Sequence, residues 1–424
     1  MENNKSAAAA TGTGTGTGTA TATTSCRSVP PLLSYFIDTF VDFSVSGGIF
    51  LPPSSYSSQN PNPSPTPPTH YPSPSRLVAI GDLHGDLPKS LQTLALSRLL
   101  DPSSLRWSGG AATAVQVGDV LDRGGDEIKI LYLLHRLRSE ALASGGLLLT
   151  IHGNHEVMNA DADFRYVTRE GLREFLDWSF WFRKGISMKL RCPDLEKPRN
   201  PFSGVPKSFP GVKKEYWEGF RARIAALRPS GPIADRFLSE NQTIVVVGDS
   251  VFVHGGITRE HVTYGLERIN EEVRDWIRGR SWNGNRIGGR VLSPSYLRGS
   301  DGVVWLRRFS DGKNCDCEDL ERVLRMMPGA TRMVMGHTIQ TEGINAVCGD
   351  RAIRIDVGLS RGCTNGLPEV LEINDGKQVR ILTANPLYDQ RRLEKVAAAV
   401  KDESKEGLAI LIQERRLKEA EVKA

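Results

Sequence analysis

Short apolar runs that end in glycine and a group of polar side chains recur along the chain, and no other feature constrains the fold as strongly. The five segments of this kind read VAIGDLHGD, VQVGDVLDRG, TIHGNHE, VFVHGG and VMGHT. Apolar runs of this length are typical of buried strands, and glycine permits the tight turn that brings the next side chain inward. Because ligands bind at the carboxyl ends of strands in α/β sheets, we expect these polar side chains to meet at one site.

Strands and helices alternate through the middle of the chain. RLVAI (76–80), TAVQV (113–117) and LLLTI (147–151) are apolar runs bordered by glycine, and helical periodicity follows Leu87 and Gly125. This alternation predicts βαβ units and therefore an α/β fold. Later strands are expected at TIVVV (243–247), VFV (251–253), RMVM (332–335), AIRIDV (352–357) and EVLEI (369–373).

Composition divides the chain into five parts. The N-terminal Ala, Thr and Gly tract cannot bury apolar surface, and a Pro/Ser-rich stretch has the composition of a linker. Between them, apolar residues recur at helical spacing around Asp38 and Asp42, as on a helix docked to a core. The expected parts are a disordered N-terminus (1–30), an apolar docking segment (31–51), a linker (52–75), a catalytic domain (76–386) with an insert or lid at 156–242, and a polar tail (387–424).

Charge and hydropathy limit the classes of partner. The formal net charge of +5 argues neither for nor against nucleic acid, and we expect no nucleic-acid partner. No apolar stretch is long and uncharged enough to predict a membrane span. Positive charge is concentrated in residues 183–228, which hold 12 Lys/Arg against 4 Asp/Glu. This segment is either a solvated basic face or a surface beside the site that attracts an acidic substrate.

The six cysteines do not form the dense pattern of a disulfide scaffold. Cys315 and Cys317 form a Cys-x-Cys pair, but neither Cys348 nor Cys363 extends it into a zinc-finger spacing. The simplest interpretation is reduced thiols in a cytoplasmic protein. The alternative is a disulfide among these four residues, with a redox or regulatory protein partner or an oxidising compartment such as the mitochondrial intermembrane space.

The polar side chains after the strands have the composition of a metal site. A mixed oxygen and nitrogen set without thiolate suits Mn, Fe or Zn better than Ca or Mg. Six ligands are too many for one tetrahedral catalytic site, but they fit two divalent ions with one bridging carboxylate. Asp119 is central in the order and is the expected bridge. The six candidate ligands are Asp82, His84, Asp119, Asn154, His254 and His337.

Three further residues in these motifs are candidates for catalysis. Arg123 could hold a phosphate bidentately, or else form a structural salt bridge with Asp126 or Glu127. His155 is next to a candidate ligand and cannot easily bind the same metal, so we expect a general acid oriented by Asp122. The remaining histidines are interpreted as structural, packing or surface residues: His152, His70, His135 and His261.

The motifs GDLHG, GDVLDRG, GNHE, HGG and GHT, in this order, resemble those of the phosphoprotein phosphatase branch of the calcineurin-like metallophosphoesterases. GDVLDRGGDEIKIL, ADFRYV and RIDVGLSRGCTNGLPEVLEI resemble the Shewanella-like protein phosphatases within that branch. LLSYFIDTFVDFSVSGG resembles their second plant class, which lacks a plastid transit peptide. The resemblance implies an α/β fold, a β-sandwich of two mixed sheets flanked by helices.

The resemblance also implies roles for individual residues. It assigns Asp82, His84 and Asp119 to one metal, and Asp119, Asn154, His254 and His337 to the other. It makes His155 a proton donor paired with Asp122. It makes Arg123 a phosphate ligand and places Arg307 at the position of a second phosphate-holding arginine.

The expected function is hydrolysis of phosphoserine, phosphothreonine or phosphotyrosine in proteins, by direct attack of a hydroxide bound to two metals. The first alternative is a nucleotide or small-molecule phosphoesterase on the same metal core. The second is a non-catalytic adaptor that binds through the basic segment or the cysteines. The complete set of six candidate ligands argues against an adaptor, because such a protein has no chemical need for all of them.

Overall fold

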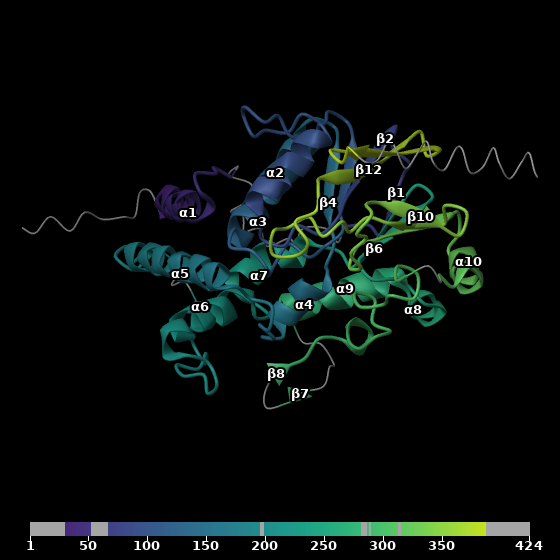
Figure 1. Ribbon diagram of the computed structural model, residues 1–424. Coiled ribbons are helices and arrows are strands. Elements are labelled where there is room, and N and C mark those ends of the chain that lie inside the picture. Colours follow the sequence, from purple (N-terminus) through teal and green to yellow (C-terminus); the bar gives the residue numbers. More distant parts are fainter. Residues whose placement is uncertain are drawn as a thin grey trace, which may run out of the picture.

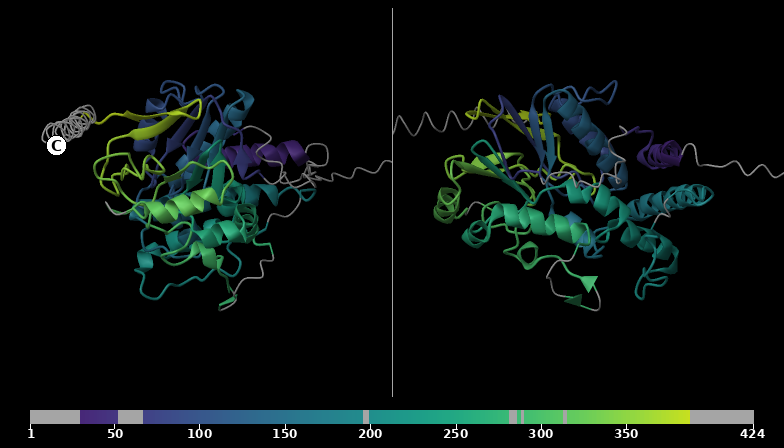
Figure 2. Two further views of the ribbon diagram at one scale, coloured as in Figure 1. Left: turned by 90° about the vertical axis from the view of Figure 1, so that its right-hand side faces the viewer. Right: turned by 180° about the vertical axis from the view of Figure 1, so that it is seen from behind.

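Two mixed β-sheets form the centre of the molecule, and helices cover them on both sides (Figures 1 and 2). The computed structural model describes residues 30–51, 67–195, 199–280, 286–287, 290–312 and 315–386. The predicted disordered N-terminus, most of the predicted linker and the polar tail therefore lie outside the described residues. The two mixed sheets and their flanking helices confirm the expected fold class.

The first sheet contains the three strands predicted from the βαβ pattern. Its order is β13-β12-β2-β3-β4, and β2, β3 and β4 are parallel, as the alternation with helices predicts. The expected strand ends are correct to within one residue for these three. The strands are β2 (Arg76–Ile80), β3 (Thr113–Gln116), β4 (Leu147–Thr150), β12 (Glu369–Asn374) and β13 (Gln378–Thr383).

The second sheet has the order β1-β5-β6-β9-β11-β10. It begins inside the predicted linker, because His70 and Tyr71 pair with Val246 and Val247. The strand expected at 352–357 ends at Arg354, since the chain then turns and delivers Asp356 to the site. The strands are β1 (His70–Tyr71), β5 (Ile244–Val247), β6 (Ser250–Val253), β9 (Arg332–Met335), β10 (Asn345–Val347) and β11 (Ala352–Arg354). A separate pair is β7 (Arg286–Ile287) and β8 (Arg290–Val291).

Helices α2 and α3 contact the first sheet, and α9 contacts the second (Figure 1). The segment 156–242 folds into most of α4 and all of α5, α6 and α7. The helices are α1 (Pro30–Ser46), α2 (Leu87–Leu96), α3 (Glu127–Ala143), α4 (Asn154–Ala160), α5 (Arg169–Lys189), α6 (Trp217–Leu227), α7 (Pro232–Arg236), α8 (Arg259–Tyr264), α9 (Leu266–Ile277) and α10 (Cys317–Arg325). Short 3-10 turns lie at Lys214–Tyr216, Leu238–Glu240 and Ser295–Leu297.

Helix α1 packs on α5 and α3 at the edge of the molecule (Figure 1). Helices α1 and α5 approach closely at Gly185 of α5, where an added Cβ would lie 2.7 Å from Cγ2 of Val41 on α1. The two acids that interrupt the apolar segment, Asp38 and Asp42, bind side chains of the elements on which α1 packs. Asp42 is buried and accepts hydrogen bonds from Tyr132 and Arg236, while Lys189 donates to Asp38. No helix in the described parts of the chain is long and apolar enough to cross a membrane.

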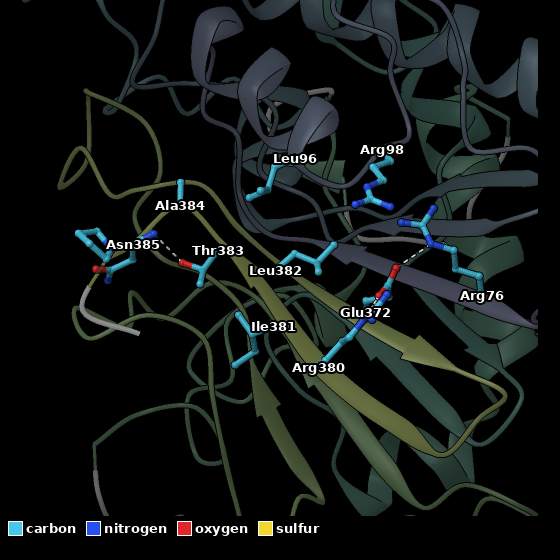
Figure 3. Close-up of a pocket in the computed structure, with 11 residues that line it drawn as sticks. Arg76, Leu96, Arg98, Glu372, Arg380, Ile381, Leu382, Thr383, Ala384 and Asn385 are labelled. Carbon is cyan, nitrogen blue, oxygen red and sulfur yellow. Dashed lines mark hydrogen bonds and ion pairs between the residues drawn. The ribbon is translucent and has the colours of Figure 1, made fainter. Parts of the chain in front are cut away.

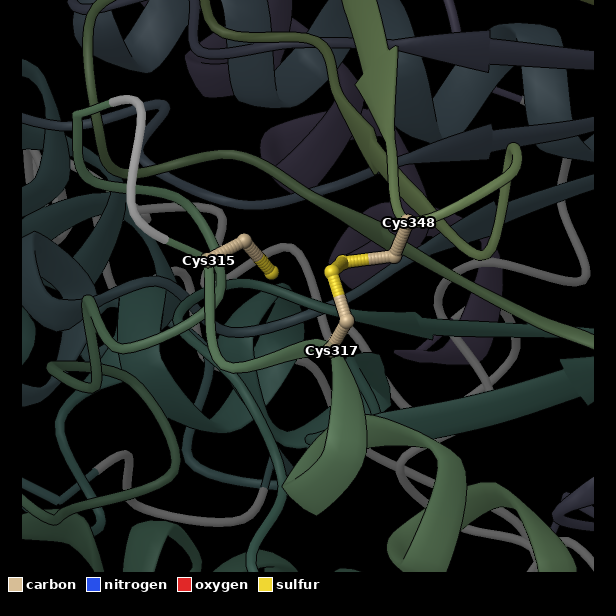
Figure 4. A group of neighbouring side chains, drawn as sticks. All are labelled: Cys315, Cys317 and Cys348. Atoms are coloured by element: carbon tan, nitrogen blue, oxygen red, sulfur yellow. A yellow bond between two sulfur atoms is a disulfide. The ribbon is translucent and has the colours of Figure 1, made fainter.

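A disulfide joins Cys317, at the start of α10, to Cys348, just after β10 (Figure 4). The expectation of reduced thiols throughout is therefore wrong for this pair, because the fold brings two residues 31 positions apart into bonding distance. Cys315 lies beside them with a free thiol, and Cys192 and Cys363 are also free. Cys26 lies outside the described residues.

Candidate metal centre

The carboxyl ends of strands from both sheets meet at one small cavity. The first sheet supplies Asp82 and His84 after β2, Asp119 after β3 and Asn154 after β4, and the second supplies His254 after β6 and His337 after β9. All six are buried. The cavity has a volume of about 50 Å³ and is lined by Asp82, His84, Asp119, Arg123, Asn154, His155, Tyr166, Trp305, Arg307, His337, Ile339 and Asp356.

Asp119 lies at the middle of the histidines. Its Oδ2 atom is 3.6 Å from Nε2 of His84, 3.8 Å from Nε2 of His155 and 3.2 Å from Nε2 of His254. Potential ligand atoms of Asp119, His254 and His337 also lie within 4.8 Å of one another. A carboxylate that faces imidazoles on several sides has the arrangement needed to bridge two cations.

Each candidate histidine ligand is held so that one ring nitrogen faces the cavity. His84 and His254 donate Nδ1–H to the carbonyl oxygens of Leu121 and Val117, at 3.0 and 2.8 Å. His337 hydrogen-bonds through Nε2 to the carbonyl oxygen of Trp305 at 3.1 Å. Since a carbonyl oxygen only accepts, the neutral form of each ring carries its lone pair on the opposite nitrogen. Metal-ligating histidines typically have such a partner on the second nitrogen.

The electrostatics of the cavity require a compensating positive charge. Burial, and then the carboxylates of Asp356 and Asp119, raise the pKa of Asp82 well above its usual value. Three buried carboxylates in one cavity repel one another. Burial lowers the pKa of His84 to about 4 and that of His337 to about 2, so both rings are neutral at neutral pH, as metal ligands must be. The donor set, its orientation and its charge fit two divalent cations.

The turns that carry the site adopt an unusual backbone conformation. Positive φ angles of 46 to 67° occur at five non-glycine residues of the site, namely His84, Asp119, Asp122, Arg123 and His337. Such angles cost free energy for L-residues and persist only where the surroundings enforce them. Gly336 allows one close approach, because a Cβ there would lie 2.4 Å from Oδ1 of Asp82. The strain is concentrated where the side chains converge.

His155 is paired with Asp122, as the sequence predicts. Its Nδ1–H donates to Oδ2 of Asp122 at 2.6 Å, and its Nε2 faces the cavity. Burial opposes protonation of the ring, but Asp119 and Asp122 together raise the pKa of His155 above its ordinary value. The imidazole therefore has one nitrogen fixed and the other directed into the cavity.

Two arginines reach the cavity. Arg123 stacks on the ring of Tyr166 at 5.0 Å, and its buried Nε has no hydrogen-bond partner among the described residues. It does not form the alternative salt bridge, because Asp126 pairs with Lys129 and Glu127 pairs with an arginine of α6. Arg307 also lines the cavity, and it donates to the carbonyl oxygen of His337 and to Oγ1 of Thr338.

Comparison with known proteins identifies the family. The sequence profile of the calcineurin-like phosphoesterases matches residues 75–340. The chain is 56% identical over 401 residues to Shewanella-like protein phosphatase 2 of Arabidopsis thaliana, covering 94% of this chain and 97% of that protein. The chain belongs to this family of Shewanella-like, calcineurin-like phosphoesterases. It is also 26% identical to Shewanella-like protein phosphatase 1 of Plasmodium berghei, over 71% of this chain and 72% of that one.

Solved structures support the fold of this phosphoesterase. A cold-active protein tyrosine phosphatase aligns with a TM-score of 0.52 and 21% identity, over 74% of this chain and 81% of its own. A crystal structure of such a phosphatase from a psychrophilic Shewanella species aligns with a TM-score of 0.51 and 19% identity, over 74% of this chain and 82% of its own. At these identities the likeness supports the shared architecture.

Sequence reasoning missed several residues of this phosphoesterase. Asp356 lines the cavity, although its segment was predicted as a continuous strand. Glu156 organises the turn after β3, because its carboxylate accepts hydrogen bonds from the backbone N–H groups of Asp119, Val120, Leu121 and Gly153. Its place in the GNHE motif was a usable signal. Tyr166 also lines the cavity and lies in the ADFRYV motif, to which the sequence assigned no role.

The other histidines lie away from the centre. His70 is exposed and pairs with Glu267, His135 packs edge-on against Phe237, and His261 lies at the start of α8 beside Thr258. His152 is 1% exposed, and neither of its ring nitrogens has a partner among the described residues. None of the four lines the cavity.

A larger pocket of about 700 Å³ lies beside the edge strand β13 and includes Arg76 at the start of β2 (Figure 3). Arg76, Arg380 and Arg98 line it with the edge strand β13. The first two arginines are both paired with the buried carboxylate of Glu372, which reduces the net charge of the pocket. The pocket contains none of the predicted site residues.

Proposed function

We propose that the protein is a phosphoprotein phosphatase that uses two divalent metal ions to hydrolyse phosphomonoesters. The convergence of imidazoles from different strands on Oδ2 of Asp119 carries this proposal. Family membership supports the reaction class, and the name of the Arabidopsis relative supports a protein substrate.

The proposed metal ligands are the six residues at the strand ends. Asp82, His84 and Asp119 would hold one ion, and Asp119, Asn154, His254 and His337 the other. Mixed carboxylate, amide and imidazole donors favour Mn, Fe or Zn. When bound, such a pair lowers the pKa of a coordinated water and polarises phosphoryl oxygens as Lewis acids.

The remaining residues of the cavity orient the substrate and move the proton. Arg123 and Arg307, which both line the cavity, would hold the phosphoryl oxygens and stabilise the charge that develops on them. His155 donates the proton of Nε2 to the leaving oxygen of the serine, threonine or tyrosine side chain. Asp122 keeps the ring oriented and favours its protonated form.

The test is a substrate panel with the purified full-length chain and its metal content measured in parallel. Peptides that carry phosphoserine, phosphothreonine or phosphotyrosine should be hydrolysed, and two metals per chain should be found by elemental analysis. Faster hydrolysis of dinucleoside polyphosphates than of any phosphopeptide would instead make the protein a nucleotide phosphoesterase. Two bound metals without hydrolysis of either class would contradict a catalytic role.

We also propose a location for the enzyme. The disulfide between Cys317 and Cys348 is more stable in an oxidising compartment than in the cytoplasm. This favours an oxidising compartment, such as the mitochondrial intermembrane space, over the cytoplasmic interpretation. Fractionation of cells that express the tagged chain is the direct test. Recovery only in the cytoplasm with all thiols reduced would contradict it.

A further inference from the structure

One arginine of the basic segment, Arg223, is not on the surface. It is buried beside Asp122, the hydrogen-bond partner of His155. Arg223 on α6 has a fully buried side chain. Its Nη1 and Nη2 donate to the two carboxylate oxygens of Glu127, at 2.9 and 2.6 Å. Nη2 also donates to Oδ1 of Asp122 at 2.8 Å, and Nε donates to Oδ1 of Asn159 at 2.7 Å. Its guanidinium therefore has partners on α3, on α4 and in the turn after β3.

Asp122 is the link between this arginine and His155. Its Oδ2 accepts the Nδ1–H of His155, while Oδ1 accepts from Arg223 and from Nδ2 of Asn159. Its backbone N–H donates to Glu127, and its φ of +67° requires outside support. Apart from His155, the residues that form hydrogen bonds with Asp122 in the described parts of the chain are Arg223 and two of its partners, Glu127 and Asn159.

Charge balance makes the arginine necessary for an ionised Asp122. Asp122 and Glu127 are both fully buried carboxylates in the same small network. Two buried carboxylates that share a site cannot both remain ionised without a cation. Arg223 is the only cation that forms an ion pair with either of them among the described residues, apart from the imidazole of His155. Its bidentate fork also fixes their relative orientation.

We propose that Arg223 is a positioning residue for the phosphatase reaction: it holds Asp122 ionised and oriented, so that Asp122 in turn holds His155 as the proton donor. This role rests on the proposed function. The guanidinium does not reach the substrate, because it lines no part of the cavity. It acts through Asp122, and its effect must therefore appear in the step that His155 assists.

The competing interpretation is a structural tie that only joins α6 to α3. Phe175 and Phe164 lie against the guanidinium at 4.5 and 5.7 Å, so its removal also disturbs packing. A purely structural role would reduce turnover of every substrate equally, in proportion to the folded fraction. A positioning role would slow substrates with basic leaving groups most, because these need the proton.

The experiment compares Arg223→Gln, Arg223→Lys and the matched control Arg221→Gln on two substrates. Arg221 lies on the same helix, but it pairs only weakly with Glu218 at 3.8 Å and is outside the network. For Arg223→Gln we expect kcat on a phosphoserine peptide to fall about 10–100-fold. This is the range for removal of a residue that orients a metal ligand through a hydrogen bond. The loss on p-nitrophenyl phosphate should be only a few-fold, with two metals retained. Arg223→Lys should recover part of the loss, and Arg221→Gln should resemble the wild type on both substrates.

Equal losses on the two substrates for a folded, metal-loaded Arg223→Gln would overturn the proposal. If that variant does not fold, the double variant Glu127→Gln/Arg223→Gln removes the opposing charges together. A selective loss on the phosphoserine peptide by the folded double variant supports the role, and a wild-type ratio of the two rates overturns it. Failure of the proposed function is distinct, because the wild-type enzyme would then hydrolyse the phosphoserine peptide poorly or not at all.

Discussion

At the scale of single residues, Asp119 connects the two halves of the proposed centre. Removal of its negative charge should weaken both metal sites, because its Oδ2 faces imidazoles from both sheets. We expect Asp119→Asn to lose metal and activity together. Elemental analysis of the purified variant, alongside a phosphopeptide assay, measures both. Retention of two metals per chain with near-normal turnover would refute the bridging role.

His155 separates catalysis from binding. A serine alkoxide is strongly basic and needs a proton, whereas p-nitrophenolate is far less basic. His155→Asn should therefore keep both metals and lose about 10²–10⁴-fold on phosphoserine peptides, the range for general acid catalysis. The loss on p-nitrophenyl phosphate should be clearly smaller.

Arg123→Ala is the matched comparison for His155→Asn. It should slow both substrates alike, because the arginine is proposed to hold the phosphoryl group that they share. Equal losses for His155→Asn on the two substrates, with metals intact, would assign the proton transfer to water or to another residue.

At the scale of elements, a carboxylate on α5 connects that helix to the start of α3. Glu174 accepts hydrogen bonds from the backbone N–H groups of Ile128 and Lys129. Burial, and then the neighbouring Glu127, raise the pKa of Glu174 to about 8. Between the ordinary glutamate pKa of about 4.3 and this value, the folded protein binds one more proton than the unfolded chain. The free energy of unfolding therefore falls as pH rises through this window, because Glu174 loses its proton in the unfolded chain and keeps it in the folded protein.

Glu174→Gln should remove this dependence, although its single amide oxygen replaces only one of the two carboxylate oxygens that accept from Ile128 and Lys129. We expect the melting temperature of the variant to rise relative to the wild type between about pH 5 and pH 8, and the difference to level off above pH 8. Thermal unfolding followed by circular dichroism across this range is the measurement. Parallel curves for the two proteins would mean that Glu174 is ionised throughout.

The docking of α1 depends on a buried acid. Asp42 accepts from Tyr132 and from both terminal nitrogens of Arg236, whereas Asp38 pairs with Lys189 in a more exposed position. Asp42→Ala should lower the free energy of unfolding by about 1–3 kcal/mol, since it leaves buried donors without an acceptor. Asp38→Ala, the control, should cost about 0–1 kcal/mol. Urea unfolding compares them, and equal effects would show that the buried contacts are not decisive.

At the scale of the whole molecule, the disulfide joins the start of α10 to the end of β10, away from the residues that line the metal centre. The chain has six cysteines, so four free thiols remain when this pair is bonded. Alkylation under denaturing conditions at the moment of isolation, followed by mass spectrometry, should give this count. Six alkylated thiols would restore the interpretation of a reduced protein.

Strands were predictable where apolar runs ended at glycine, and less so at the sheet edges. β10 and β13 were not predicted, because their side chains are half-buried or exposed and lack the continuous apolar pattern of a central strand. β1 has only two residues and follows a Pro/Ser-rich stretch. β1 is a strand because it pairs with β5, which lies more than 170 residues further along the chain. The Tyr71 hydroxyl also donates a hydrogen bond to Gln242, just before β5.

The sequence by itself determined the candidate ligands, because each is set by a local rule: a buried strand, a glycine turn and a polar side chain a few residues apart. Only the tertiary structure decided which residues far apart in the sequence become partners. Arg223 is 101 residues from Asp122, and Cys317 is 31 from Cys348. One basic residue among the 12 lysines and arginines of the basic segment has no local mark that distinguishes it. A charge becomes a buried partner only when packing removes it from water, and packing depends on the whole chain.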